Sequence, residues 1–524
     1  MKDRRSVSLI GRSLLNPVFY GTLLLTVSGC MVGPSYHKPH SWAPSHYDMH
    51  SQDHGHASTS SVVTQAPMAD DWWKNFHDPE LSSLEERVAT QNLNFLLSSA
   101  NLAQSRAQMM IAGAERFPNL AAQGSYTRAQ HSTKELQEVF KRVGRHVGDR
   151  LPPGVAGSSG RDFLTGGQEA QVPLLNQWQD KIDATYEIDL WGRVAHQYQA
   201  AKAVSQMSEE ERRSVLIARQ ADMARDYLQL RGDQKRQAVL ASQHQTLTQL
   251  RQLSENRYRT GLVTELDVDS VNARLHDLEA QQASLDQSVA QEMNAIALLL
   301  GAPPQSLNGE LTKTATIPTL PPFVPAGLPS ELAQRRPDIR EADAHLRETV
   351  AEVGEATADF YPKVTITADF GFQTLSFRDL GFWNAKAWNV GPTISLPIFQ
   401  GGRLYGQLKL KRAAQRSAAI EYRQTVLQAW NEVDNALQAY HDEQVRHDGL
   451  AQAVADNQRA LSLATSQYRS GLGTYLDVLN AQTQLQSSQL DLTGSDAVMA
   501  TNLARLYNAL GGGWKKDLPE ETHH

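Results

Sequence analysis

Two aspartates, Asp267 and Asp477, occupy the same position in a stretch that occurs twice in this chain. The first copy is Tyr258–Val268 and the second, 210 residues later, is Tyr468–Val478. A carboxylate in the first turn of a helix stabilises it, because the amino end of a helix carries partial positive charge. No spaced catalytic constellation emerges around either aspartate, so helix capping is the simplest chemistry that the sequence assigns to them.

The same stretch predicts a tight turn between two antiparallel helices. In each copy a glycine is suited to end one helix in the left-handed conformation, and a threonine is suited to cap the next. These residues are Gly261 and Thr264 in the first copy, and Gly471 and Thr474 in the second. Two interpretations stay open: a plain hairpin turn, or a functional tip at which Leu262 and Leu472 are exposed.

The 210-residue offset holds well beyond the turn and indicates an internal duplication. Gly192 falls on Gly402, and Gly301 falls on Gly511. The chain therefore divides into two similar halves with a proline-rich linker between them and a short tail. We assign 79–302 to the first repeat, 303–330 to the linker, 331–511 to the second repeat and 512–524 to the tail.

Cys30, the single cysteine, is a second candidate for chemistry. It follows a basic N-terminus and the mostly apolar stretch 14–27, which is the pattern of a secretory signal. A lone cysteine excludes a disulfide framework. The sequence thus points to a signal peptide over 1–29.

Residues 25–30 resemble the lipobox of bacterial lipoproteins, although Val27 stands where leucine is usual. The resemblance implies cleavage before Cys30 and lipidation of that cysteine, with 30–78 as a lipidated, extended N-terminal segment. Met31 after the cysteine favours sorting to the outer membrane. The alternative is an ordinary signal peptide with an incidental cysteine.

The segment that follows Cys30 is rich in histidine, which raises the question of metal binding. Its histidines are His37, His40, His46, His50, His54 and His56. The spacings are irregular and carry no cysteine or carboxylate pattern, so a solvated linker is favoured over a metal site. We expect no metal and no cofactor other than the covalent lipid.

Composition narrows the functional classes. The net charge of −7 argues against nucleic acid as a partner. Beyond the leader, no stretch reaches the roughly 18 apolar residues of a membrane helix, so a membrane role requires the lipid or β-strands. No phosphate-binding loop or metal cluster is evident either, and we expect the protein not to be an enzyme.

Alternation of apolar and polar residues predicts two strands in each half. The expected strands are 119–129, 180–190, 363–373 and 388–398. Their length suits a membrane span, and tryptophans near their ends favour a membrane interface. A half-buried sheet in a soluble domain would give the same alternation.

Helical periodicity predicts one helix over 79–116, its counterpart over 331–360, and a very long helical hairpin after the second strand of each half. A helix from Gly192 to Arg259 would be about 100 Å long. Four strands cannot close a barrel, which needs about eight, and open edges are costly in lipid. Several copies of the chain must therefore share one barrel.

Taken together, the lipobox, the duplicated strand–strand–long-hairpin halves, the two Tyr-Arg-x-Gly-Leu turns and Arg335–Arg340 resemble the TolC-like outer membrane factors, in particular the lipoprotein branch of tripartite efflux systems. The resemblance implies a mixed fold of membrane β-barrel and long α-helical barrel, with four strands and four main helices from each protomer. It implies a homotrimer with a twelve-stranded β-barrel and a twelve-helix periplasmic tunnel. The partners it implies are a periplasmic adaptor, an inner-membrane transporter of the resistance-nodulation-division type and outer-membrane lipid.

The resemblance also implies roles for the tip residues. Asp267 and Asp477 match the family's gate carboxylates, and Tyr468 matches its tethering tyrosine. Asn480 stands where some members have a second aspartate, so the resemblance implies a ring with less charge. Gly473 stands where some have the tethering arginine, so the link to Asp267 is weaker or is borne by Arg469. The turn that meets the adaptor corresponds to Gly261, Leu262, Gly471 and Leu472.

The function implied is a passive exit duct for small toxic compounds, with a periplasmic gate that opens when partners dock. Two rivals remain: an outer-membrane duct of an ATP-driven secretion system, and a lipoprotein scaffold of coiled coils without a pore. The alternating strands disfavour the scaffold. The exported compound, whether drug, solvent, aromatic acid or metal ion, is left open.

Overall fold

The computed structural model describes residues 31–39, 62–64, 66, 68–130, 174–313, 316–327 and 332–513. These residues form two compact units. Of the described residues, the strand unit takes 31–34, 110–130, 174–198 and 352–410, and the helical unit takes the others. Cys30, the leader and every N-terminal histidine listed above except His37 lie outside the described residues.

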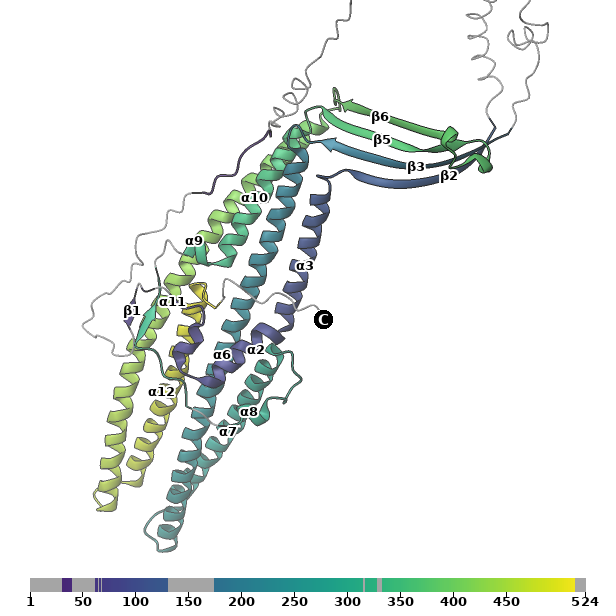
Figure 1. Ribbon diagram of the computed structural model, residues 1–524. Helices are drawn as coiled ribbons and strands as arrows, with labels where there is room; N and C mark the ends of the chain where they lie inside the picture. The colour runs from purple at the N-terminus through teal and green to yellow at the C-terminus, as the bar shows by residue number, and fades with distance from the viewer. Residues whose placement is uncertain are drawn as a thin grey trace, which may run out of the picture. The chain divides into compact units, whose positions relative to one another are not determined.

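The strand unit contains one antiparallel sheet of four long strands in the order β2-β3-β5-β6 (Figure 1). The strands are β2 (Asn119–Ala129), β3 (Leu175–Ile188), β5 (Lys363–Thr374) and β6 (Lys386–Ser395). Apolar side chains on one face of each strand are exposed, among them Leu120, Ile182, Phe370 and Ile394. The predicted alternation is therefore present, and this chain alone does not cover its apolar side.

Two of the strands differ from the sequence prediction at their ends. β3 begins at Leu175 rather than at 180, because Trp178 pairs with Tyr126 across the ladder and their rings lie 4.2 Å apart. β6 runs from Lys386 to Ser395 instead of 388–398. β6 ends where its partner begins, because Ser395 pairs with Lys363, the first residue of β5.

The helices that precede the strands are interrupted, whereas the sequence predicted each as continuous. Over 79–116 the structure has α2 (Pro79–Gln91) and α3 (Leu93–Ala114). Asn92 separates them: its backbone is extended, and its side-chain oxygen accepts a hydrogen bond from the Phe95 N–H. The counterpart over 331–360 is α9 (Leu332–Arg335) followed by α10 (Pro337–Ala358), where proline at the first helical position starts the second helix.

The two long hairpins have equal dimensions, as an internal duplication requires. α6 (Arg193–Arg259) and α11 (Arg403–Arg469) each span 67 residues, and α7 (Glu265–Leu299) and α12 (Tyr475–Ala509) each span 35. We call α6 with α7 the first hairpin and α11 with α12 the second hairpin (Figure 1). Among the described helices, none is both long enough and apolar enough to cross a membrane.

The main core of the helical unit joins both repeats. Trp72 in the short helix η1 (Trp72–Phe76) stacks on Tyr507 of α12, with ring centroids 5.1 Å apart. Buried residues of α2, α6, α7, α11 and α12 surround this pair. In the linker region, α8 (Asn308–Leu311) is followed by β4 (Phe323–Pro325), which pairs in parallel with β1 (Val62–Thr64).

Candidate functional site

The turn of the first hairpin is a helix end closed by a left-handed glycine. Gly261 has φ +72°, its N–H donates to the Tyr258 carbonyl at 2.9 Å, and the Leu262 N–H donates to the Arg257 carbonyl at 2.9 Å. The turn of the second hairpin repeats this pattern, with Gly471 at φ +79°. A side chain at either glycine would strain the backbone, which confirms the local role predicted for both.

Both aspartates cap the helices that follow. The Thr264 N–H donates to Asp267 Oδ2 at 3.0 Å, and the Thr474 N–H donates to Asp477 Oδ2 at 2.9 Å. Each threonine hydroxyl also donates to the same carboxylate. The hydrogen bonds from Thr474, first from its hydroxyl and then from its backbone, lower the pKa of Asp477. Asp477 is exposed and Asp267 is half-buried, so both carboxylates reach solvent and their charge can also act on solutes at the tip.

The tips present leucines to solvent. Leu262 is 74% exposed and Leu472 is 84% exposed, as expected for a functional tip. Leu266 and Leu476, four residues further on, are 73% and 61% exposed. The sequence analysis missed this second pair, although both lie at the shared 210-residue offset. Each tip therefore carries two exposed leucines.

Tyr468 lies beside a residue that the sequence analysis did not single out. The guanidinium carbon of Arg257, on α6, is 4.2 Å from the centre of the Tyr468 ring on α11. The Tyr468 hydroxyl is buried and has no hydrogen-bond partner among the described residues. Within that part of the chain, no hydrogen bond joins Tyr468 to Asp267, and Arg469 is exposed.

An apolar cluster lies next to this stack and draws on all four long helices. Val271 of α7 packs against Tyr475 and Leu479 of α12, with Leu250 of α6 and Tyr468 of α11 at its edge. We call these five residues the tip cluster. Burial raises the pKa of Tyr475, so its phenol stays neutral at physiological pH. The tip cluster thus links the two hairpins through apolar and aromatic contact.

Asn480 and Gly473 are the two departures from the pattern that the resemblance implies. Asn480 is exposed on α12. Gly473 is half-buried, and a Cβ there would lie 3.2 Å from the Gln467 Cβ. A side chain at 473 therefore requires a small adjustment of its own hairpin. Neither residue is bonded to Asp267 or Tyr468 in the part of the chain that the structure describes.

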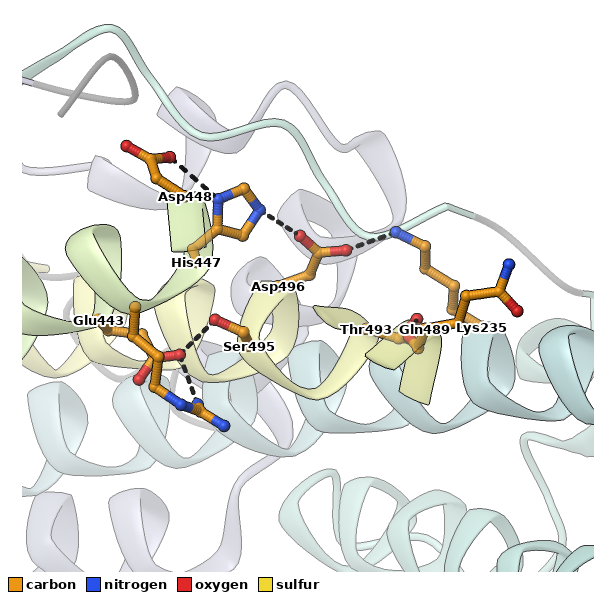
Figure 2. A network of polar contacts seen from close by, with 9 residues as sticks. Lys235, Glu443, His447, Asp448, Gln489, Thr493, Ser495 and Asp496 are labelled. Atoms are coloured by element: carbon orange, nitrogen blue, oxygen red, sulfur yellow. Dashed lines mark hydrogen bonds and ion pairs between the residues drawn. The ribbon is translucent and has the colours of Figure 1, made fainter. Parts of the chain in front are cut away.

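Further along the same helices, a charged group links the hairpins (Figure 2). Asp496 of α12 lies 2.9 Å from His447 Nε2 on α11 and 2.5 Å from Lys235 Nζ on α6. We call Lys235, His447 and Asp496 the mid-helix link. Because Lys235 belongs to the first hairpin and Asp496 to the second, their ion pair fastens one hairpin to the other.

Next to the mid-helix link, α6 and α12 approach each other closely. A Cβ added at Gly232 would lie 2.5 Å from the Ala497 Cβ. Only a residue without a side chain fits at this distance. Towards the tip, the contact between the two helices continues through Gln243 and Gln489, whose side-chain amides are 3.4 Å apart.

Metal binding finds no support in the described residues, where no cluster of three or more histidine, cysteine or acidic side chains could hold an ion. His37, the one described histidine of the N-terminal segment, lies 3.0 Å from the Ser35 hydroxyl. The lipidation predicted at Cys30 falls outside the described residues.

Comparison with known proteins shows which family has this architecture. The model of the outer membrane efflux protein family matches residues 86–302 and 328–512, which is most of the chain. The chain belongs to the outer membrane efflux protein family. Its relatives are efflux channels rather than enzymes, in agreement with the sequence prediction.

Individual relatives cover nearly the whole chain. The solvent efflux pump outer membrane protein SrpC of Pseudomonas putida is 31% identical, over 94% of this chain and 97% of its own. The solved structure of the outer-membrane channel OprN is 29% identical, with a TM-score of 0.79 over 93% of this chain and all of OprN. The open state of the MtrE outer membrane channel of Neisseria gonorrhoeae is 25% identical, with a TM-score of 0.74 over 94% of this chain and all of MtrE.

Proposed function

We propose that this efflux protein is the outer-membrane exit duct of a tripartite pump. It conducts small toxic compounds passively from a periplasmic adaptor and an inner-membrane transporter, of the resistance-nodulation-division type, to the outside. SrpC, a solvent efflux pump component, supports this class of cargo. The observation that carries the proposal is the four-stranded sheet whose apolar face its own chain leaves exposed.

The sheet supports assembly as a homotrimer. In the described part of the chain, β2 and β6 each pair with one strand only, and neighbouring strands alternate in direction. β6 of one copy would therefore lie antiparallel to β2 of the next. Three copies would supply twelve strands, above the minimum of about eight for a closed barrel, and their long helices would form the twelve-helix tunnel.

The start of the described chain supports lipidation at Cys30 after removal of the signal peptide 1–29. The Val32 N–H donates to the Trp191 carbonyl at 3.1 Å, and the Val32 carbonyl lies 2.8 Å from His196 Nε2. These bonds hold the chain two residues after Cys30 beside the junction of β3 and α6. If the strands span the outer membrane, this junction lies at its periplasmic face, where a lipid anchor would insert.

The tips are the proposed periplasmic gate and docking surface. Asp267, Tyr468, Asp477 and Asn480 form the gate, which opens when partners dock. The adaptor contacts Gly261, Leu262, Gly471 and Leu472, and the exposure of both leucines supports that assignment. The helical part would then lie in the periplasm.

Reconstitution of the purified protein in planar bilayers tests the proposal. We expect trimers that dissociate only on heating and that give discrete conductance steps. A monomer with full secondary structure and no conductance would instead favour the scaffold without a pore. Two measurements on a deletion strain separate small-molecule efflux from secretion. Greater susceptibility to drugs and solvents supports efflux, and loss of secreted proteins supports secretion.

A further inference from the structure

We infer that the resting tips of the two hairpins are held together by the stack of Arg257 on Tyr468 and by the tip cluster behind it, and not by a bond to Asp267. This inference rests on the proposed gate and specifies the contact that must break when it opens. Arg257 thereby becomes a gating residue that neither the family pattern nor the sequence analysis identified.

The stack joins one hairpin to the other. Arg257 belongs to α6 and Tyr468 to α11, and the guanidinium carbon lies 4.2 Å from the ring centre. A cation within about 6 Å of an aromatic face is attracted by the negative charge of that face. Among the described residues, no carboxylate lies within ion-pair distance of Arg257, so the ring is the partner that the structure gives it.

The Asp267 carboxylate and the Tyr468 hydroxyl, the groups that could form a polar tether, are not bonded to each other. Asp267 accepts two hydrogen bonds from Thr264 of its own hairpin. The buried Tyr468 hydroxyl has no hydrogen-bond partner in the described part of the chain. Tyr468 therefore contributes its ring to the contact between hairpins, and its hydroxyl contributes little.

The tip cluster supplies the remainder of the contact. The rings of Tyr468 and Tyr475 lie 5.7 Å apart at 60°, and Val271 and Leu479 are buried against Tyr475. Moving the second hairpin away from the first exposes this apolar surface to water, which is unfavourable. Apolar contact is not screened by ions, whereas exposed ion pairs weaken as salt rises.

The duplication makes the stack asymmetric. At the 210-residue offset, Arg257 corresponds to Gln467 and Tyr468 corresponds to Tyr258. Only the first hairpin therefore carries a cation at this position, and Tyr258 is 46% exposed in the single chain. Each copy of the protein makes the link once, from its first hairpin to its second.

The test uses single-channel recordings of the full-length trimer. Arg257→Gln removes the cation but keeps a long polar side chain, and Arg259→Gln removes the same charge from an exposed position two residues away. We expect Arg257→Gln to raise the ratio of open to closed dwell times roughly tenfold, as loss of about 1.4 kcal/mol would do. Arg259→Gln is expected to change the ratio less than about twofold, the size of a minor surface charge effect.

Variants of the polar groups separate the two kinds of tether. Tyr468→Phe keeps the ring and Asp267→Asn keeps the shape of the cap, so each is expected to raise the dwell ratio clearly less than Arg257→Gln does. Tyr468→Leu removes the ring and should act like Arg257→Gln. The effect of Arg257→Gln should persist between about 0.1 and 1 M salt, over which the screening length falls from about 10 to about 3 Å.

The opposite pattern overturns the inference. If Asp267→Asn or Tyr468→Phe opens the channel while Arg257→Gln does not, the tether is polar, and the proposed channel function stands. If wild-type protein gives no conductance, the channel function itself fails. Trimer melting temperatures of all variants show whether a change reflects gating or folding, and Arg257→Lys, which keeps the cation, should restore part of the closed state.

Discussion

Two of the contacts between the hairpins, the mid-helix link and the contact at the tip, differ in their chemistry. At the mid-helix link, Asp496 accepts from Lys235 and lies beside His447, and the helices touch at Gly232 and Ala497. At the tip, the contact is an arginine over a ring and a cluster of apolar side chains. One contact is charged and specific in geometry, and the other is aromatic and tolerant of displacement.

This difference distinguishes a contact that keeps the two hairpins together from a contact that can open and close reversibly. A short ion pair at a close helix crossing is weakened by even a small displacement, because a charge-assisted hydrogen bond depends on its distance and angle. An aromatic and apolar patch breaks without leaving a buried charge unpaired, so its separation is easier to reverse. The comparison assigns the fixed end of the hairpins to the mid-helix link and the moving end to the tip.

The largest effect is expected where the tip meets its partner. Leu472→Asp places a charge on the most exposed leucine of the second tip, and a carboxylate in an apolar contact costs at least about 2 kcal/mol. Efflux in cells should fall to the level of a deletion strain while trimers persist. The matched control is Leu298→Asp, at the other end of α7, where the leucine is 74% exposed. Retained efflux in Leu472→Asp would remove the docking role from the tip.

A substitution at the helix crossing should have the next largest effect. Gly232→Ala brings two Cβ atoms to 2.5 Å, and overpacking of this kind costs about 1–3 kcal/mol. Ala497→Gly in the same chain should recover most of that loss in thermal unfolding of the trimer. Gly449→Ala, on α11 with no heavy atom within 4 Å of the added methyl, should be neutral or stabilising. Equal destabilisation by both alanines would argue against a close crossing.

The charged character of the mid-helix link predicts a smaller effect that depends on salt. Lys235→Met removes one partner of the partly exposed pair with Asp496, for a loss of about 0.5–1 kcal/mol at low salt that shrinks as salt rises. A double-mutant cycle with Asp496→Asn measures the coupling in urea unfolding. The same cycle for Arg257 and Tyr468 should show a weaker salt dependence, because the cation is in direct contact with the ring. If both cycles respond alike to salt, the two contacts do not differ as described.

The smallest effect concerns the cap at Asp477. Because Thr474 lowers the folded pKa of this carboxyl, the cap contributes its stability above the ordinary pKa of 3.8 and loses it as pH falls through the lower folded value. Amide exchange in the first turn of α12 should therefore quicken in acid. Asp477→Asn should show quicker exchange already at neutral pH and little further change in acid. An unchanged acid response in this variant would assign the effect to another group.

Local patterns in the sequence predicted much of this fold. Alternation at 363–373 and the doubled Gly–Leu turn with its threonine cap led to the strands and the hairpins, because each signal lies within a few adjacent residues. The break at Asn92 was missed because one asparagine both ends α2 and caps α3 without disturbing the apolar periodicity. The early start of β3 was missed because its first residues are stabilised by a ring contact across the ladder.

The site was less predictable than the fold. The aspartates and exposed leucines follow from the turn, but the partner of Tyr468 lies on another hairpin, 211 residues earlier in the chain. The duplication concealed Arg257, because the matching position in the second copy is Gln467 and no shared motif draws attention to it. Contacts between the repeats depend on how the helices pack, which local periodicity does not encode.

Gly232 also bears on how one hairpin could turn against the other. Packed helices usually set their crossing angle by interlocking the ridges of side chains on one with the grooves of the other. Here Gly232 of α6 has no side chain where it contacts the methyl group of Ala497, so at this point no side-chain ridge of α6 locks into a groove of α12. The axes lie close together at that point and no side chain of Gly232 opposes a change in their inclination, so a small tilt there becomes a large displacement at the far end of helices of this length.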